Sequence, residues 1–421
     1  MPQPAPPDSL GNPTPPYAMA MALPDAVTPR QGLVVDGGPN ARLPVDLARC
    51  RRILVVRLDF IGDWVLTTPF LANLRASAPD AEITVVVLNR VFDLARSCAF
   101  VDRVIGVEPA AAGPVSFYAA DQATLASFIA DYGNYLFDLA LVPRWDTDFN
   151  SALRIADGSG AATVIGFSEA NTAHRRANNR GDDRFYSAIL RDTEAMHEVD
   201  HKLGLLAAMG GTTEQRDLTL HLDPADKRRA AEFLVKRLGG ADRFIAIAPF
   251  AVPRKQVPPE RSAVLANRLS ETLDLPVVVV GSPVHAPNAA AFLSELKGPA
   301  ASAVGLPLGA SAALIGRASM LIGMDSGPAH IAAALNTPVA VIFNHARSAA
   351  PDHVGSPERF APWGEPSRVL VLRPDEPLAP CTDGCEVDAA HCITQLDVDD
   401  LYPPIADFAA RFVAVRDPVF S

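Results

Sequence analysis

A short polar run, Asp325-Ser326-Gly327-Pro328, separates an apolar segment from an Ala-rich one, and His330 follows it closely. This pattern predicts a strand, a tight turn and the start of a helix. Ser326 suits the N-cap, Pro328 suits the first helical turn, and Gly327 allows the backbone to approach a ligand. The N–H groups and dipole of such a helix favour a phosphate or diphosphate, toward which His330 could point. The alternative is a plain strand-to-helix turn that binds nothing.

A second charged group, Arg57, Asp59 and Asp63, follows the apolar run 53–56. We expect a buried parallel strand there, and then a helix that continues to Leu74. Because α/β folds bind ligands at the carboxyl edge of the sheet, Asp63 is a candidate catalytic carboxylate. The alternative is that Asp63 only caps the helix, which would stabilise it by about 1 kcal/mol. Asp59 is the second candidate for the catalytic role.

Two successive β/α series are expected to position these residues, because apolar runs alternate with amphipathic ones from residue 51 onward. The first series has expected strands at 52–57, 83–88, 101–107, 137–142 and 162–166, and expected helices at 63–77, 121–131, 148–157 and 195–209. The second has expected strands at 244–248, 276–280, 319–323 and 338–343, and expected helices at 224–238, 259–273, 286–297, 309–317 and 328–335. The stretch 108–136 reads as an insertion near a sheet edge.

The domain organisation follows from these two series. Residues 1–48 contain 11 of the 38 prolines and are predicted to be a disordered extension, or in part an incorrectly assigned start that precedes a true one at Met19 or Met21. Two Rossmann-like domains are expected at 49–222 and 223–396. A C-terminal segment, 397–421, is expected to form a helix that packs back across the domains.

The two motifs together resemble glycosyltransferase family 9, the ADP-heptose:lipopolysaccharide heptosyltransferase family. Arg57, Gly62-Asp63 and Thr68-Pro69 match its R-x-x-x-x-G-D and T-x-P positions, and residues 325–335 match its D-[ST]-G-P-x-H-x-A-A-x-L motif. The resemblance covers about residues 51–403. It implies an α/β protein of the GT-B fold, in which two doubly wound Rossmann-like domains face a central cleft.

Further segments are similar to the family but depart from it in places. Residues 164–167 look like its strand ending in G-F, and residues 247–260 look like its P-G-x…K-x-W-P-x-E segment, with Lys255 at the lysine. Phe250 and Val257 stand where Gly and Trp are expected, and His285 stands where an acidic residue is usual. These departures bear on which sugar nucleotide is bound.

The resemblance implies an inverting transfer of heptose from ADP-heptose to a lipopolysaccharide-core or related glycan acceptor. Asp63 would be the general base, and Lys255 with the 325–330 turn would stabilise the leaving ADP without a metal. Arg57, Arg175 and Arg176 are candidates to bind an anionic glycolipid or glycan acceptor, the last two in a loop that also carries other arginines. A different nucleotide sugar, or a catalytically silent nucleotide-sugar-binding protein, is the alternative.

Composition limits the partners. The formal net charge of −11 argues against nucleic acid as a general partner. No apolar run approaches the ~18 residues that span a bilayer, and the N-terminus lacks the features of a secretory signal. A cytoplasmic protein without a cofactor is expected, with peripheral contact at the inner membrane left open.

Two residue groups suggest metals. Cys381, Cys385 and Cys392 lie near His391, which raises a zinc hypothesis, but their spacing is looser than paired C-x-x-C ligands and favours reduced structural thiols. The Asp146-Thr147-Asp148 sequence has the form of a D-x-D metal motif, although it could equally cap the next helix. We therefore expect no catalytic metal.

Overall fold

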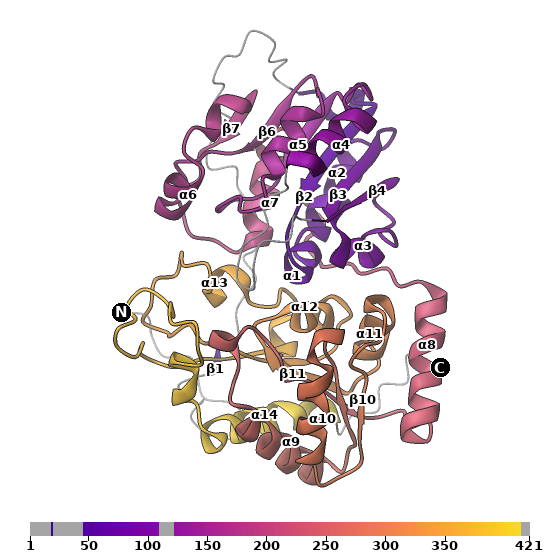
Figure 1. The fold of residues 1–421 in the computed structure, drawn as a ribbon, viewed down its shortest axis with the longest axis vertical. Coiled ribbons are helices and arrows are strands. Elements are labelled where there is room, and N and C mark those ends of the chain that lie inside the picture. The colour runs from indigo at the N-terminus through magenta and orange to yellow at the C-terminus, as the bar shows by residue number, and fades with distance from the viewer. Residues whose placement is uncertain (1–17, 20–44, 109–121, 414–421) are drawn as a thin grey trace. The chain divides into compact units, whose positions relative to one another are not determined.

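The computed structural model describes residues 18–19, 45–108 and 122–413 (Figure 1). The described chain forms two units. The N-terminal unit runs from residue 45 to Lys227 and includes Glu358–Trp363, and the C-terminal unit takes Ala18–Met19, Arg228–Pro357 and the chain from Gly364. The observed boundary therefore lies five residues beyond the predicted one at 222. Glu358–Trp363 was expected in the C-terminal domain, but the structure places this segment in the N-terminal unit.

A parallel sheet forms the centre of the N-terminal unit, with its strands in the order β4-β3-β2-β5-β6-β7. The strands are β2 (Arg52–Arg57), β3 (Glu82–Leu88), β4 (Arg103–Val107), β5 (Leu139–Val142), β6 (Val164–Phe167) and β7 (Ala188–Leu190). Since β2 is first in this unit and β5 is its other neighbour, the strand order reverses between β2 and β5. Ligands of doubly wound sheets bind at such a reversal.

Helices form the other regular elements of this unit. They are η1 (Leu47–Arg49), α1 (Ile61–Val65), α2 (Thr68–Ser77), α3 (Asn89–Ala95), α4 (Gln122–Tyr132), α5 (Ala152–Gly158), α6 (Ala173–Asn178), η2 (Asp182–Phe185), α7 (Glu198–Ala208) and α13 (Pro357–Phe360). The predicted helix 63–77 is divided into α1 and α2. The Thr67 hydroxyl donates to the Asp63 carbonyl at 2.7 Å and the Thr68 hydroxyl to the Val65 carbonyl at 2.8 Å. The new helix begins at Thr68, and Pro69 lies in its first turn.

The C-terminal unit repeats this design, with strands in the order β1-β13-β12-β11-β8-β9-β10. They are β1 (Ala18–Met19), β8 (Ile245–Ala248), β9 (Val277–Val279), β10 (Ala300–Ser302), β11 (Met320–Met324), β12 (Val339–Ile342) and β13 (Val369–Leu372). All pairs are parallel except β1 with β13. The strand order reverses between β8 and β11, which gives this unit its own ligand-binding point.

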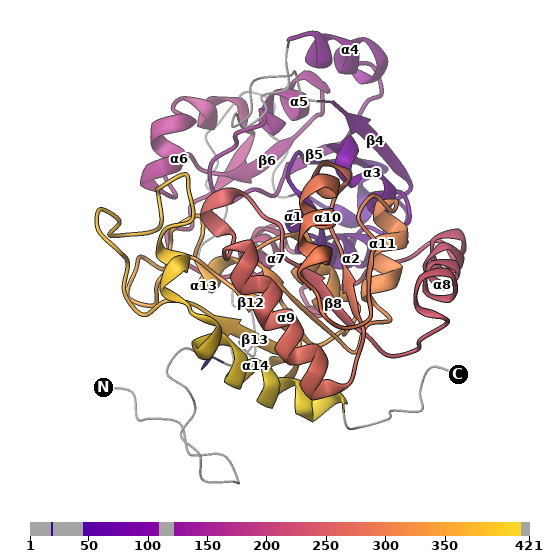
Figure 2. The same cartoon turned by 60° about the horizontal axis from the view of Figure 1, so that its bottom comes forward.

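The helices of this unit are α8 (Pro224–Leu238), η3 (Pro253–Lys255), α9 (Pro259–Leu273), η4 (Pro283–His285), α10 (Ala286–Ser294), α11 (Leu308–Ile315), α12 (Gly327–Ala334), η5 (Pro366–Arg368), η6 (Cys392–Gln395) and α14 (Val398–Val413). Helix α14 is the predicted last helix. It lies beside α9 (Figure 2), and its apolar face joins the core of the C-terminal unit through Leu401, Ile405 and Phe408. The structure therefore places α14 in one unit, and the expected packing across both domains stays a prediction.

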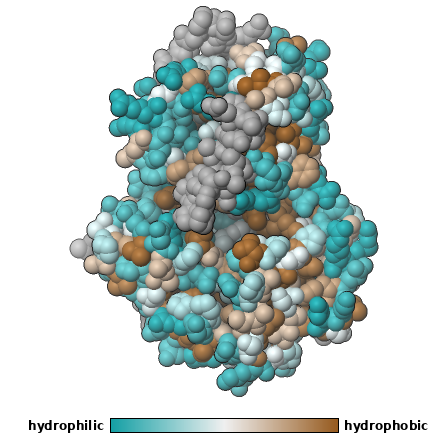
Figure 3. All heavy atoms as spheres, viewed as in Figure 1, coloured by the Kyte–Doolittle hydropathy of each residue, from teal (hydrophilic) through white to brown (hydrophobic). Residues whose placement is uncertain are grey.

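The predicted extension 1–48 lies largely outside the described residues. Within it, β1 pairs with β13, and Leu47 of η1 is buried. Each unit has its own apolar core. On the face shown in Figure 3, hydrophilic side chains are interspersed with small apolar patches. In the part of the chain that the structure describes, no helix has the length and apolar character to cross a membrane.

Candidate active site

The strand reversal of the N-terminal unit carries a cluster of charged side chains. Arg57 is the last residue of β2, and Arg144 follows the neighbouring strand β5. Both guanidinium groups reach Asp59, with the Arg57 Nη1 atom 2.8 Å from its Oδ2 atom. The Arg57 Nη2 atom is also 3.2 Å from the Asp63 Oδ1 atom, and the Arg144 Nη1 atom is 3.6 Å from the same oxygen. Two arginines thus hold two carboxylates at the carboxyl edge of the sheet.

The Asp63 side chain is not a helix cap. Phe60 occupies the N-cap position of α1 and Asp63 lies in its first turn, where a carboxylate interacts favourably with the helix dipole. Both arginines contact the Oδ1 atom of Asp63, and among the described residues none forms a hydrogen bond or ion pair with its Oδ2 atom. Asp63 therefore combines a fixed orientation with one oxygen that can accept a proton.

Asp59 is held more tightly than Asp63. Its side chain is 9% exposed against 14% for Asp63, and its two oxygens are each paired with an arginine. Burial raises the pKa of Asp59, and the charges of Arg144 and Arg57 oppose this. With both oxygens committed, Asp59 fits the role of fixing the arginines better than that of a base.

A buried ionic network supports this cluster within the same unit. Arg359 from α13 lies 2.8 Å from Asp146 and 2.7 Å from Glu198, and Lys202 lies 3.1 Å from Glu198. Burial raises the pKa of Asp146, but Arg359 and Arg144 outweigh burial and lower it to about 2. Burial also lowers the pKa of Lys202 to about 8, although the charge of Glu198 opposes the shift. The network fixes α7 and residues 144–146 around the first cluster.

The strand reversal of the C-terminal unit carries the second candidate group. Lys255 lies in η3, which follows β8, and Asp325 follows the neighbouring strand β11. The Lys255 Nζ atom and an Asp325 carboxylate oxygen form an ion pair, in which the lysine side chain stays 22% exposed. Asp325 thus holds an ammonium group at the point where a doubly wound sheet binds its ligand.

Helix α12 begins at the same point. Ser326 is its N-cap, Gly327 its first residue, and Pro328 lies in the first turn, which confirms the predicted strand, turn and helix. The Ser326 hydroxyl donates to the Met324 carbonyl at 3.2 Å and makes no cap hydrogen bond. His330 is buried in this first helical stretch. The start of α12 and the Lys255 ammonium together favour a bound anion.

Comparison with known proteins identifies the chain. Residues 133–388 match the family model for glycosyltransferase family 9 (heptosyltransferase), which is more than half of the sequence. The chain belongs to glycosyltransferase family 9. It is 24% identical to lipopolysaccharide heptosyltransferase 3 of Escherichia coli over 318 residues, which cover 73% of this chain and 84% of that protein.

Solved structures show the same GT-B fold. The glycosyltransferase family 9 protein of Veillonella parvula is 21% identical with a TM-score of 0.67, and the comparison covers 87% of this chain and 98% of that one. Heptosyltransferase II of E. coli is 17% identical with a TM-score of 0.63, with coverages of 86% and 99%. The E. coli heptosyltransferase WaaC solved with ADP is 17% identical with a TM-score of 0.61, with coverages of 85% and 99%. The predicted fold class is confirmed.

Two of the arginines predicted to bind the acceptor are buried in this glycosyltransferase. Arg175 is fully buried, and its guanidinium donates to the backbone carbonyls of Arg144, Asp146 and Phe167. It fixes the position of α6, the helix that carries it, and is inaccessible to an acceptor in solvent. Arg57 is buried too and orients the carboxylates, as described above. Of the three expected acceptor-binding arginines, Arg176 remains exposed.

The D-x-D sequence of the enzyme has a structural role in this unit. Asp146 pairs with Arg359, and the Asp148 carboxylate accepts hydrogen bonds at 3.0 Å from the backbone N–H groups of Ala152 and Leu153 at the start of α5. The capping alternative is therefore confirmed for Asp148. A hollow of about 320 Å³ opens beside it, lined by Thr147, Asp148, Phe149, Ser151, Leu153, Arg154, Asn178, Asn179 and Asp182.

Two of the departures from the family pattern contact each other in the C-terminal unit. The rings of Phe250 and His285 lie 5.0 Å apart, and a Cβ atom on Gly281 would come within 3.0 Å of the Phe250 ring and 3.2 Å of the His285 ring. Val257 is fully buried in the core. A glycine at position 281 thus leaves room for the two rings that the family pattern lacks.

Several charged residues in and around the first candidate group were not predicted. Arg144 had a usable signal, because it follows the strand next to β2 by two residues. Glu198 and Lys202 also had one, because they stand four residues apart on the same helix, α7. Arg359 had none, since both of its carboxylate partners lie far from it in the sequence. The two cysteines outside the Cys381–Cys392 segment, Cys50 and Cys98, are buried, and burial raises the pKa of each thiol to about 11, as expected of packing residues.

Proposed function

We propose that this family 9 enzyme transfers heptose from ADP-heptose to a lipopolysaccharide-core saccharide or a related cell-surface glycan. The names of its relatives support this substrate class: one is a lipopolysaccharide heptosyltransferase, and WaaC was solved with ADP and with ADP-2-deoxy-2-fluoro heptose. The observation that carries the proposal is Asp63, a carboxylate held by two arginines through one oxygen while the other remains available.

Asp63 is proposed to act as the general base. Its Oδ2 atom takes the proton of the acceptor hydroxyl while that oxygen bonds to the anomeric carbon of the donor sugar. The bond between the anomeric carbon and the diphosphate oxygen breaks at the same time, and ADP leaves with the bonding electrons. Attack opposite the leaving group inverts the anomeric configuration.

The C-terminal unit is proposed to hold the donor and stabilise the departing diphosphate. Lys255 supplies a positive charge, and the N-terminal N–H groups of α12, at Ser326, Gly327 and beyond, point their dipoles at the developing negative charge. Asp325 positions Lys255 through their ion pair. Pro328 and the buried His330 complete this first helical stretch.

The acceptor is proposed to be an anionic glycolipid or glycan bound by the N-terminal unit. Exposed Arg176 in α6 is the remaining candidate contact, since the other two expected arginines have structural roles. The charged side chains that line the hollow beside α5 are those of Asp148, Asp182 and Arg154. Because two of the three are acidic, the hollow does not favour an anion. We place the reaction at the cytoplasmic face of the inner membrane, which cell fractionation with a tagged chain would test.

Donor binding provides the test of this function. In a thermal-shift series with ADP-heptose, ADP, UDP-sugars and GDP-sugars, ADP-heptose and ADP should raise the melting temperature by mass action and the others should not. Turnover with ADP-heptose and a lipopolysaccharide-core acceptor should then release ADP. Stabilisation by UDP- or GDP-sugars alone would contradict the proposed donor.

A family 9 enzyme with another nucleotide sugar is the second candidate, favoured by one observation. Phe250 and His285 replace the expected Gly and acidic residue, and their rings lie against each other. The same series of nucleotides distinguishes the two candidates. A catalytically silent binding protein would bind a donor in that series and release no product with any acceptor.

The chemistry is proposed to need no divalent metal, because Asp146 and Asp148 are committed to Arg359 and to α5. Transfer measured in EDTA should equal transfer in Mg²⁺ or Mn²⁺. A rate that disappears in EDTA and returns with either ion would show that a metal takes part in the chemical step.

A further inference from the structure

An irregular segment of the C-terminal unit needs an explanation of its stability. Within the described chain, residues 373–391 contain no helix or strand between β13 and η6. Such long irregular segments are uncommon inside compact domains unless something orders them. Cys381, Cys385 and His391 lie in this segment, and Cys392 begins η6 directly after it.

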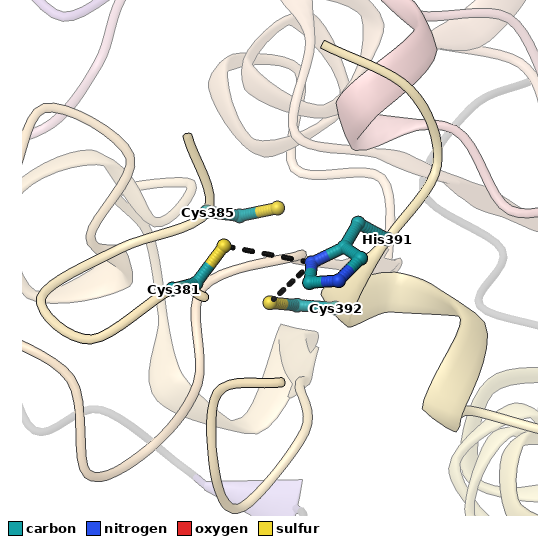
Figure 4. A group of neighbouring side chains, drawn as sticks. All are labelled: Cys381, Cys385, His391 and Cys392. Atoms are coloured by element: carbon teal, nitrogen blue, oxygen red, sulfur yellow. Dashed lines mark hydrogen bonds between the residues drawn. The ribbon is translucent and has the colours of Figure 1, made fainter. Parts of the chain in front are cut away.

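These four side chains converge. Their ligand atoms, three sulfurs and one imidazole nitrogen, all lie within 4.8 Å of one another. The side chains point toward a common centre (Figure 4), and the His391 Nδ1 atom is 3.5 Å from the sulfurs of both Cys381 and Cys392. A tetrahedral zinc ion about 2.3 Å from sulfur and 2.0 Å from nitrogen requires a sulfur-to-nitrogen distance of about 3.5 Å. The spacing of the group therefore fits a zinc ion.

The surroundings of the group resemble those of a closed site. The three cysteines are 7%, 5% and 1% exposed, and Leu378 and Val387 pack against them. None of the three forms a disulfide. Thiolate sulfur selects zinc and other soft metals over Mg²⁺ and Ca²⁺. A set of four protein ligands is typical of structural rather than catalytic zinc, because no position is left for a substrate.

Contacts outside the group fix the backbone that presents it. The His391 carbonyl accepts a hydrogen bond from the Thr394 hydroxyl at 2.6 Å, and Arg261 donates to the Thr394 carbonyl at 2.6 Å. A Cβ atom on Gly384 would lie 2.3 Å from the His353 ring, so the chain between the first two cysteines lies against that ring. Such outer contacts hold ligands in place at metal sites.

We propose that Cys381, Cys385, His391 and Cys392 bind a structural zinc ion that closes the 373–391 segment. The site also has a link to the donor side of the enzyme. Helix η6, which begins with Cys392, contacts η3, which carries Lys255. Through Cys392, a bound zinc ion holds η6 in place beside η3, while taking no part in the chemical step.

Metal content of the full-length chain tests this site. The protein is purified with its thiols kept reduced, and zinc, iron and copper are measured by mass spectrometry. We expect about one zinc ion per chain, retained by Cys98→Ser and lost by Cys385→Ser. Cys98 is the matched control because it is also a buried free cysteine but lies outside the group. Iron or copper in place of zinc, or less than about a tenth of an ion per chain, would overturn the proposal.

Two further measurements keep the test decisive if Cys385→Ser does not fold. An organomercurial added to the wild-type protein should release zinc to a chromogenic chelator as the thiols react. Cobalt substitution should give the visible bands of a tetrahedral site with thiolate charge transfer. A cobalt spectrum without thiolate bands, or peptide mapping that finds a disulfide between two of the three cysteines, would contradict the site. ADP binding and turnover are measured separately, so either result would contradict the zinc site without deciding the proposed donor.

Discussion

At the residue scale, the proposed reaction depends on two charged side chains, each held by an ion pair that leaves part of the charged group available to a substrate. Asp63 is held through Oδ1, and Lys255 is held by Asp325 while its side chain stays 22% exposed. In both cases a fixed ion pair sets the orientation, so little conformational entropy remains to be lost when substrate binds.

Lys255→Met should weaken ADP binding by about 10–100-fold, because a hydrogen bond to a charged group contributes about 1.5–3 kcal/mol. Isothermal titration calorimetry measures the affinity. Lys297→Met is the control, since Lys297 is an exposed lysine of the same unit. Equal ADP affinity in both variants would remove Lys255 from the donor site.

Individual residues also mark the limits of sequence interpretation. Ser326 and Asp325 were placed correctly because a strand, a turn and a helix N-terminus follow from local pattern. Arg175 was not, because a segment rich in arginine suggests exposure, whereas its guanidinium donates to three backbone carbonyls, two of them about thirty residues away in the sequence. Burial of a charged group depends on tertiary contacts that the local sequence does not contain.

At the element scale, the strand ends do most of the positioning. The strands β2, β5, β8 and β11 were all predicted, since each is a short apolar run of a parallel sheet. The strands β7 and β10 were missed because three residues do not stand out from a loop or a helix. The strand β13 was also missed, although it is an apolar run of the same length as β5 and β8. The division of α1 from α2 arises from threonine hydroxyl bonds to carbonyls, which a helical period does not reveal.

Helix α5 offers a test of whether Asp148 is a cap. Asp148→Ala should lower the free energy of unfolding by about 1 kcal/mol, because two N–H groups at the start of α5 lose their acceptor. Asp148→Asn keeps one acceptor oxygen, so its free energy of unfolding should lie between those of the wild type and Asp148→Ala. Urea denaturation gives the values. A variant with unchanged stability but no transfer activity would instead indicate a role in the reaction.

At the scale of the whole molecule, the chain crosses between its two units more than once. The segment Glu358–Trp363 belongs to the N-terminal unit although its neighbours in sequence belong to the C-terminal one. Arg359 anchors it through Asp146 and Glu198. No sequence signal marked this return, because a buried ion pair joins residues 213 positions apart.

The Asp146–Arg359 pair predicts a dependence of stability on pH. The folded-state pKa of Asp146 is about 2, below its ordinary value of 3.8, so the pair stabilises the fold above pH 4 and its contribution is lost as pH falls toward 2. Asp146→Asn should therefore cost about 2 kcal/mol at pH 7, and the difference from wild type should shrink by about 1 kcal/mol between pH 5 and pH 3. Denaturant unfolding at each pH measures it. A difference that stays constant over this range would show that Asp146 does not titrate with folding.

We propose that the two strand reversals have different roles: the C-terminal unit binds the donor, and Asp63 in the N-terminal unit removes the acceptor proton. Asp63→Asn keeps the size of the side chain and removes its basicity. The decisive measurement is ADP-heptose affinity and single-turnover rate in the wild type and in Asp63→Asn.

We predict donor affinity within a factor of about two and a rate lower by about 10²–10⁴, the usual contribution of a general base. Lys255→Met should show the opposite pattern, in which the main effect is a loss of donor affinity. A normal single-turnover rate in Asp63→Asn would contradict the account and move the base to another residue.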